Sequence, residues 1–421
     1  MAPSAMDYLR DLAAAVIEAS SVHPGQSVAG APPNTTGATL IRPGGRNDYP
    51  ACWVRDFAMS LDCGLIPAGQ IRHHLRLFAR TQNGPQERRL NSGAVIPPFA
   101  IADHVNFDGA PVFYPGTYSA GEDQGAEPWG VLPPADDHYY FVHAAHSLYK
   151  AAKDPAFLAE RIEGLPMLDR LIKAFDAPAS DETTGAVTTD PLRRAVGFGF
   201  FDSVFMTGAM LFPTLLRYQA ALELAALCQA AGQANLTPGF KRIAARILAH
   251  LPAVFAPADP SVGWLNAATG VSGQPDVWGT LMALDLKVLP HDYARRARTS
   301  VARAVADGTI EYSGAVRHVP VNRDAGPDTA WQRSLAPYNT YQNGAYWHTP
   351  TGWLVAALRD HHPSLAQAVL HRYLDHLRTG DFRQGGNFGA PWECLGRDAA
   401  ARQNPVYMTS VTLPLAVLSR R

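Results

Sequence analysis

Apolar residues recur at helical spacing along most of the chain, which predicts an all-α protein. The predicted helices cover residues 6–20, the second half of 42–64, 68–80, 136–150, 154–175, 238–254, 276–287, 290–304, 351–360, 364–378 and 407–419. A further long helix follows Asp202 and runs to about Gly232, with Pro213 either kinking it or marking its start. Residues 307–320 alternate enough to predict a short strand or hairpin.

The order of these helices predicts a closed ring. Short turns alternate with long loops rich in aromatic residues, the longest covering residues 84–135. The rings in that loop indicate that it is ordered. Helices taken in pairs can close into an (α/α)6 toroid, in which inner and outer helices alternate while long loops and minor β-hairpins form a pocket at one end. No Ser/Gly-rich linker or charge block interrupts the chain, so we expect a single domain over residues 1–421.

The charge balance argues against polyanionic partners. Thirty-six Lys and Arg residues against 37 Asp and Glu leave a net charge of −1, so electrostatics favours neither nucleic acid nor an anionic membrane. The N-terminal residues lack the basic start and apolar core of a secretory signal. No run of about eighteen apolar residues is present. We therefore expect a cytoplasmic protein with a neutral small-molecule partner, present as a monomer or a homodimer.

Cysteine and histidine spacing does not predict a metal site. The four cysteines are scattered without a C-x-x-C pair, which favours reduced thiols over a zinc knuckle. His138, His143 and His146 share one predicted helix, but only the first and last fall near one face, and no H-E-x-x-H spacing occurs. We therefore expect no metal site.

Residues 341–353 concentrate aromatic rings and amides around two glycines. Such a surface is typical of sugar binding, because aromatic faces cover the C–H side of a pyranose while amides and indole N–H groups meet its hydroxyls. A buried aromatic turn before a helix would have the same composition. The candidate sugar contacts here are Gln342, Asn343, Tyr346, Trp347 and Trp353.

A second polar stretch precedes the helix in the second half of residues 42–64. It is rich in glycine and delivers Arg46, Trp53, Arg55 and Asp56 to the start of that helix. These charged groups can serve a ligand at the helix mouth, or they can form an ordinary ion pair at a helix end.

Two carboxylates suit the hydrolysis of a glycosidic bond, which needs one protonated carboxyl and one ionised carboxylate. Asp202 is surrounded in sequence by Phe198, Phe200, Phe201 and Phe205, which could raise its pKa by desolvation. It could instead be the N-cap of the long helix. Glu393 follows Trp392 in a glycine-rich loop before the last helix, where a structural role is equally open. Asp276, two residues before Trp278, suits an N-cap that also binds a sugar hydroxyl.

The order of these segments resembles the trehalases and, more broadly, the six-hairpin glycosidases of families 63 and 15. The trehalase Pro-Gly-Gly-Arg-Phe and Trp-Asp pattern is similar to residues 43–46 and 53–56 here. The Gln-Trp-Asp-x-Pro-x-Gly-Trp pattern is similar to residues 342–353, without the Asp. The segment that carries the general acid is similar to residues 193–202, with Phe where the pattern has Glu and Trp. Glu393 lies where the family has its base.

The resemblance implies a toroid and an inverting hydrolysis without a cofactor, in which Asp202 is the general acid and Glu393 the general base. It also implies an exo-acting site that holds one terminal sugar, with Arg46, Trp53, Arg55, Asp56 and Arg193 among its contacts. The carboxyl groups of an inverting pair lie roughly 6.5–9.5 Å apart.

Other functions fit the same toroid. A sugar 2-epimerase would place His138, His146 or His348 in the pocket, and a phosphorylase would replace the base by a phosphate site. A non-catalytic sugar-binding protein would keep the rings without activity. A protein-interaction toroid would instead show its rings on an open face.

Overall fold

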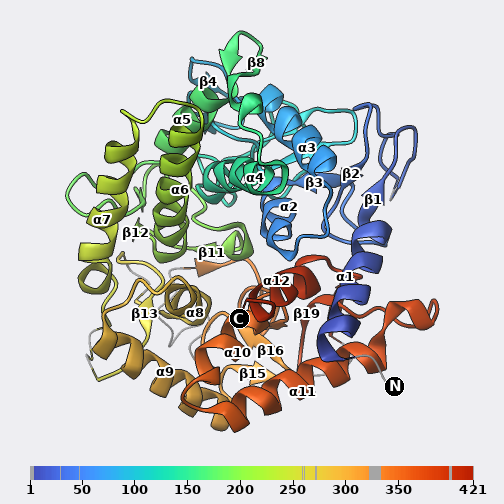
Figure 1. Ribbon diagram of the computed structural model, residues 1–421, viewed down its shortest axis with the longest axis vertical. Helices are drawn as coiled ribbons and strands as arrows, with labels where there is room; N and C mark the ends of the chain where they lie inside the picture. The colour runs from blue at the N-terminus through green and yellow to red at the C-terminus, as the bar shows by residue number, and fades with distance from the viewer. Residues whose placement is uncertain are drawn as a thin grey trace.

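The computed structural model describes residues 4–28, 30–46, 48–257, 259, 261–270, 273–321, 333–397 and 401–420, and these form twelve α-helices. The helices are α1 (Ala5–Ser20), α2 (Val54–Met59), α3 (Ala68–Thr81), α4 (Asp136–Ala152), α5 (Met167–Asp176), α6 (Leu211–Ala230), α7 (Thr237–Val254), α8 (Val277–Asp285), α9 (His291–Ala306), α10 (Thr351–Arg359), α11 (Pro363–Gly380) and α12 (Thr409–Leu418). Figure 1 shows them arranged as a ring around a central axis.

The even-numbered helices form the inner ring. Helix α4 packs between α2 and α6, α8 lies between α6 and α10, and α12 contacts both α10 and α2, which closes the circle. Each odd-numbered helix covers the outside of this ring, as α7 covers α6 and α11 covers α10. The predicted (α/α)6 toroid is therefore confirmed.

The position of each helix in the ring follows from its hydrophobic pattern. In the inner helix α8, every residue from Val277 to Leu284 is buried, as expected for a helix that is apolar all round. The outer helix α5 buries only Met167, Leu168, Arg170, Leu171, Ala174 and Phe175. Outer helices thus need one apolar face, whereas inner helices need apolar residues on nearly all faces.

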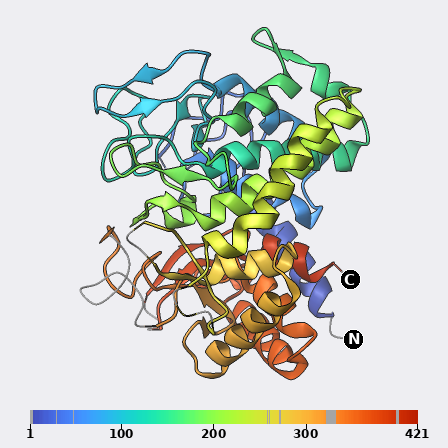
Figure 2. The same cartoon turned by 90° about the vertical axis from the view of Figure 1, so that its left-hand side faces the viewer.

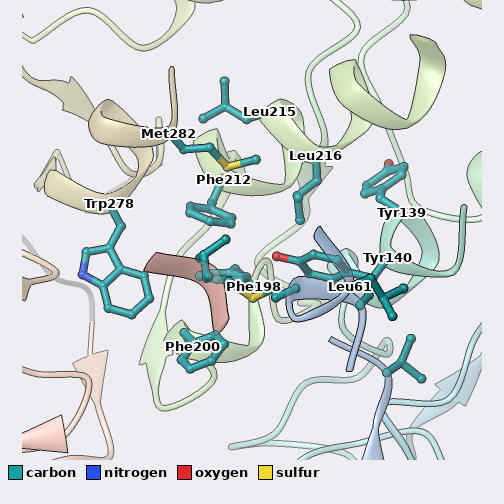
Figure 3. Packing of buried hydrophobic residues seen from close by; sticks show 14 of the residues in the cluster. Leu61, Tyr139, Tyr140, Phe198, Phe200, Phe212, Leu215, Leu216, Trp278 and Met282 are labelled. Carbon is teal, nitrogen blue, oxygen red and sulfur yellow. The ribbon is translucent and has the colours of Figure 1, made fainter. Parts of the chain in front are cut away.

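Aromatic side chains fill the centre of the ring. Phe198 stacks on Phe212 with ring centroids 3.7 Å apart, and Phe200 lies 5.6 Å from Trp278. Figure 3 shows these rings beside Leu216, Tyr140 and Met282 from the inner helices. The interior is therefore a packed core that supports the loops at one end.

Short strands and long loops gather at one end of the ring (Figure 2). One antiparallel sheet has the order β15-β16-β18-β19-β20 and another the order β3-β6-β7. Their strands are β3 (Ala51–Trp53), β6 (His104–Asn106), β7 (Pro111–Val112), β15 (Glu311–Tyr312), β16 (Ala315–Arg317), β18 (Tyr346–Trp347), β19 (Trp392–Leu395) and β20 (Arg402–Pro405). Strand β3 leads directly into α2, so the sheet that contains β3 fixes where that helix begins.

The other strands form two-stranded pairs. They are β1 (Ser21–Val22) with β2 (Leu40–Ile41), β4 (Arg88–Arg89) with β5 (Val95–Ile96), β8 (Arg161–Ile162) with β9 (Leu165–Pro166), β10 (Thr188–Thr189) with β12 (Gly208–Ala209), β11 (Val204–Phe205) with β17 (Arg333–Ser334), and β13 (Leu265–Asn266) with β14 (Pro275–Asp276). The predicted hairpin within residues 307–320 is confirmed as β15 and β16.

One predicted helix was wrong in its bounds, and for the long helix after Asp202 the alternative that Pro213 marks its start is confirmed. Residues 154–175 contain a 3₁₀ turn at Ala156–Ala159 and the β8–β9 hairpin before α5 begins. Positive φ angles at Glu163 and Gly164 make the tight hairpin turn, which a helix cannot include. Helix α6 begins at Leu211, so Pro213 lies in its first turn, where proline is tolerated.

No helix in the described part of the chain combines the length and the apolar character needed to cross a membrane. All four cysteines are buried and free.

Candidate active site

A compact cavity of about 220 Å³ opens at the end of the ring where the inner helices begin. Arg55 and Asp56 lie in the first turn of α2, and Asp202 comes from the loop that leads toward α6. The complete lining is Tyr49, Trp53, Arg55, Asp56, His104, Pro115, Gly116, Thr117, Tyr118, Gly199, Phe200, Asp202, Tyr341, Gln342, Glu393 and Tyr407.

Asp202 is held by its neighbours rather than by a helix. It follows the 3₁₀ turn Gly199–Phe201, and the N-cap of α6 is Met210, so Asp202 does not cap that helix. The Gln342 amide accepts hydrogen bonds from Ser203 N (2.8 Å) and Ser203 Oγ (2.7 Å) and donates to Gly199 O (3.0 Å). Because Gln342 bonds to both sides of the turn, it fixes the direction in which Asp202 enters the cavity.

The surroundings of Asp202 favour its protonated form. Burial raises the pKa of Asp202 to about 7, and the carboxylates of Asp103 and Asp136 act in the same direction. The charge of Arg55 and the hydrogen bond with Gln342 oppose this rise. A carboxyl with such a pKa can give a proton near neutral pH.

Glu393 projects from β19 and is only 2% exposed. The Tyr341 hydroxyl donates to Glu393 Oε1 over 3.3 Å, and the Asn404 amide donates to Oε2. Burial raises the pKa of Glu393 to about 7, whereas hydrogen bonds from Tyr49, Asn404 and Tyr341 lower it. Donors on both carboxylate oxygens orient the group and stabilise its ionised form.

The two carboxyls belong to one site. Both line the same cavity, and the negative charges of Glu393 and Asp202 both contribute, after burial, to raising the pKa of the Tyr341 hydroxyl well above its ordinary value. The structure thus brings together one carboxyl from the loop before α6 and one from the strand before α12.

Arg55 lies beneath the cavity among four buried carboxylates. Its guanidinium is 3.3 Å from Asp103, 3.5 Å from Asp136, and 3.8 Å from both Asp56 and Asp137. Gly199 packs directly on this guanidinium, because a Cβ atom added there would overlap it. The arginine is therefore fixed in place, and it partly neutralises the acidic group below Asp202.

The charges in this cluster differ. Burial raises the pKa of Asp56, Asp136 and Asp137 above their ordinary value. For Asp103, burial acts in the same direction, but the hydrogen bond from His104 and the charge of Arg55 lower the pKa overall. The pair of Arg55 and Asp103 is thus the ionised centre of the cluster.

Aromatic rings form one wall of the cavity. His104 stacks on Trp53 with ring centroids 4.4 Å apart, and Tyr118 meets Trp53 edge-on at 5.9 Å. His104 Nδ1 bonds to Asp103 Oδ2 over 2.7 Å, while Nε2 has no hydrogen-bond partner among the described residues. The bond to Asp103 places a proton on Nδ1 and fixes the orientation of the ring.

Several sequence candidates lie outside the cavity lining. Arg46 donates to backbone carbonyls of Gly386 and Phe388 and so braces the loop before β19. Arg193 is 55% exposed and pairs with Glu87. Asp276 is the N-cap of α8, where it accepts from Gly279 N over 2.7 Å.

The other aromatic and amide candidates also lie outside the cavity lining, and they either are buried in the core or contact other side chains or backbone groups. Trp278 and Trp347 are fully buried, and Trp278 stacks on His318. The Asn343 amide donates to Ala336 O. Tyr346 lies in β18 beside Arg317, Trp353 lies near the far end of the barrel, and half-buried Trp392 lies beneath Arg402.

Other cavity residues were not among the sequence candidates, namely Tyr49, His104, Tyr118, Tyr341 and Tyr407, together with Asn404 beside Glu393. The pair Asp103-His104 was a visible signal within the long loop, because a carboxylate beside a histidine commonly orients the ring. Among the described residues, no group of three or more His, Cys, Asp and Glu side chains is arranged to hold a metal ion.

Comparison with solved structures places the fold among enzymes that act on sugars. The chain aligns over 97% of its length with 99% of a GH63 mannosylglycerate hydrolase from Thermus thermophilus in complex with glucose (TM-score 0.59, 15% identity). It aligns over 99% of its length with 64% of a rhamnosidase from Klebsiella oxytoca with rhamnose bound (TM-score 0.58, 12% identity). The chain therefore spans just under two thirds of that rhamnosidase.

A third similar structure is the cellobiose 2-epimerase from Spirochaeta thermophila, with a TM-score of 0.57, 12% identity and coverage of 100% of this chain and 98% of that one. No family model and no curated protein matches the sequence. The chain thus shares its (α/α)6 fold with two hydrolases and an epimerase.

Proposed function

We propose that the protein is an exo-acting, inverting glycoside hydrolase, with Asp202 as general acid and Glu393 as general base. The observation that carries this proposal is that the carboxyls of Asp202 and Glu393, which come from separate elements, line one compact cavity. Hydrolysis with inversion needs such a pair, with space between them for the sugar and a water molecule.

The assignment of the two roles follows from their surroundings. Burial, together with the negative charges of Asp103 and Asp136, favours the neutral form of Asp202 against the opposing charge of Arg55. Tyr341 and Asn404 donate to Glu393 and favour its ionised form. Asp202 would protonate the leaving oxygen while Glu393 takes a proton from the attacking water, and the glycosidic C–O bond breaks as the new C–O bond forms.

The rest of the cavity suits one sugar ring. Trp53, His104 and Tyr118 offer a ring wall for the C–H face of a pyranose, while Asp56 and Gln342 offer polar groups for hydroxyls. The similar rhamnosidase binds rhamnose and the similar mannosylglycerate hydrolase binds glucose, and we therefore expect a neutral terminal pyranose here.

The proposal is tested with 4-nitrophenyl glycosides of α-D-glucose, α-D-mannose and α-L-rhamnose, together with matching disaccharides. We expect release of one free sugar, and proton NMR of the first product should show the anomer opposite to that of the substrate. Release of the same anomer would contradict inversion. No release from any substrate would contradict the hydrolase assignment.

A second candidate function is sugar 2-epimerisation, because the His104 ring, oriented by Asp103, lines the cavity and its Nε2 has no hydrogen-bond partner among the described residues. His138, His146 and His348, which that function would use, are not among the lining residues. Incubation of cellobiose, glucose and mannose in D₂O separates the two functions. Exchange of the C2 hydrogen, lost in His104→Gln, would favour the epimerase.

A further inference from the structure

A second cavity of about 390 Å³ adjoins the first. Gly116, Asp202 and Tyr341 border both cavities. The second one is otherwise lined by Trp129, Ser203, Leu335, Ala336, Pro337, Thr340 and Gln403. Glu393 lines only the first cavity. Asp202 therefore lies at the boundary, with Glu393 on one side of it and the second cavity on the other.

This position has a chemical consequence, which rests on the proposed function. A general acid contacts the oxygen that joins the terminal sugar to its leaving group, whereas an inverting base acts from the opposite face of the sugar. When the terminal sugar fills the first cavity, the glycosidic bond lies beside Asp202 and the leaving group extends toward the second cavity. We propose that the second cavity binds the leaving group, and that it selects a neutral alcohol with a flat apolar face.

Trp129 supplies the surface for that face. The indole is partly exposed and lies against Gly116, where a Cβ atom would overlap the ring. Gly116 also has a φ of 82°, so both the space and the backbone at this position require glycine. The ring is thus held in place before any ligand arrives, which lowers the entropic cost of stacking on it.

The charges and hydrogen bonds of the second cavity exclude other classes of leaving group. Among its described lining residues, Asp202 carries the one carboxyl group, and none is a lysine or arginine. A carboxylate-bearing leaving group would therefore find no cationic partner among these described residues. Two polar groups are already engaged, since Ser203 Oγ bonds to Gln342 and Thr340 Oγ1 donates to Pro337 O. An aryl alcohol or the apolar face of a sugar ring fits these walls.

The test compares leaving groups on one sugar. The glycosyl fluoride has a leaving group too small to reach Trp129, whereas the 4-carbamoylphenyl glycoside extends over it. In Trp129→Ala we expect the ratio of kcat/KM for the aryl glycoside to that for the fluoride to fall at least about tenfold. Trp129→Phe should restore most of that ratio, and Tyr312→Ala, an exposed ring outside both cavities, should leave it unchanged.

A second comparison tests the charge argument. The wild type should cleave the 4-carbamoylphenyl glycoside at least about tenfold better, in kcat/KM, than the isosteric 4-carboxyphenyl glycoside at pH 7. Disaccharides of the same sugar show whether a sugar ring or an aryl alcohol is preferred.

The outcomes are distinguishable. An unchanged ratio in Trp129→Ala, or equal rates on the charged and neutral aryl glycosides, would overturn the leaving-group assignment while leaving the hydrolase intact. Failure of the wild type to cleave any fluoride or aryl glycoside would instead overturn the proposed function and this assignment with it.

Discussion

The hydroxyl of Tyr341 donates a hydrogen bond to Oε1 of Glu393 over 3.3 Å, and the same ring borders both cavities of the site. Tyr341 therefore links the proposed base to the place where the leaving group would depart. The hydroxyl stays protonated at ordinary pH, because burial and the nearby carboxylates raise its pKa well above the ordinary value. It can thus act as a permanent donor to Glu393.

Replacing this donor should change the ionisation of the base. In Tyr341→Phe we expect the pKa of Glu393 to rise, because a hydrogen bond to the charged form is lost. The acidic limb of the pH dependence of kcat/KM should move upward by about half to one pH unit. An unmoved acidic limb would show that Tyr341 does not support the base.

The wild-type pH dependence should be bell-shaped with a maximum near pH 7. Burial is the main reason why the pKa values of Asp202 and Glu393 are both about 7. Activity should fall as the pH drops, because Glu393 becomes protonated, and fall as it rises, because Asp202 loses its proton. The prediction is checked by measuring kcat/KM from about two pH units below this maximum to about two above it. A flat profile would contradict the roles assigned to Asp202 and Glu393.

Gly199 should tolerate no larger residue. A side chain at this position would overlap the Arg55 guanidinium, so Gly199→Ala should move Arg55 or the turn that carries Asp202. We expect a loss of roughly 1–3 kcal/mol in unfolding free energy together with reduced kcat. Urea denaturation measures the first effect. Gly69→Ala in α3 is the matched control, because a Cβ atom there meets nothing within 4 Å.

The far end of the barrel offers a prediction about stability. His143 Nδ1 lies 2.7 Å from Glu223 Oε1, and the two residues are buried there with Asp62 nearby. Burial acts against both charges, yet the interaction lowers the pKa of Glu223 and raises that of His143. Breaking a buried ion pair by removing one partner costs roughly 3–5 kcal/mol.

The sign of each shift gives the pH range. Stabilisation through Glu223 is present above its ordinary pKa and is lost as the pH falls through the lowered value in the folded protein. Stabilisation through His143 is present below its ordinary pKa of 6.5 and is lost as the pH rises through its raised value. The Tm deficit of Glu223→Gln should therefore be largest at roughly pH 5–6 and smaller at about pH 9. A deficit that grows toward alkaline pH would contradict this account.

The sequence predicted the architecture well because inner and outer helices both follow helical spacing. It failed at residues 154–175, where the local turn at Glu163 and Gly164 overrides that spacing. Helical periodicity alone left the start of α6 open, since the loop before Leu211 is also rich in apolar residues, whereas Pro213 marked the correct start.

The cavity lining was only partly predictable. The sequence identified six lining residues, because polar side chains beside glycines and aromatic rings indicate a binding site. They are Trp53, Arg55, Asp56, Asp202, Gln342 and Glu393. Trp278 and Trp347 lie in the core instead, since a large ring serves packing as well as binding. His104 and Tyr118 come from the long loop of residues 84–135, where no periodicity indicates which side chains face inward.

The most direct test of the central claim is the rate of glycoside hydrolysis by Asp202→Asn and Glu393→Gln beside the wild type, with substrate binding measured by calorimetry. We predict that both variants still bind the substrate but lose roughly 10²–10⁴-fold in kcat. Hydrolysis at the wild-type rate by either variant would contradict the role assigned to that carboxyl.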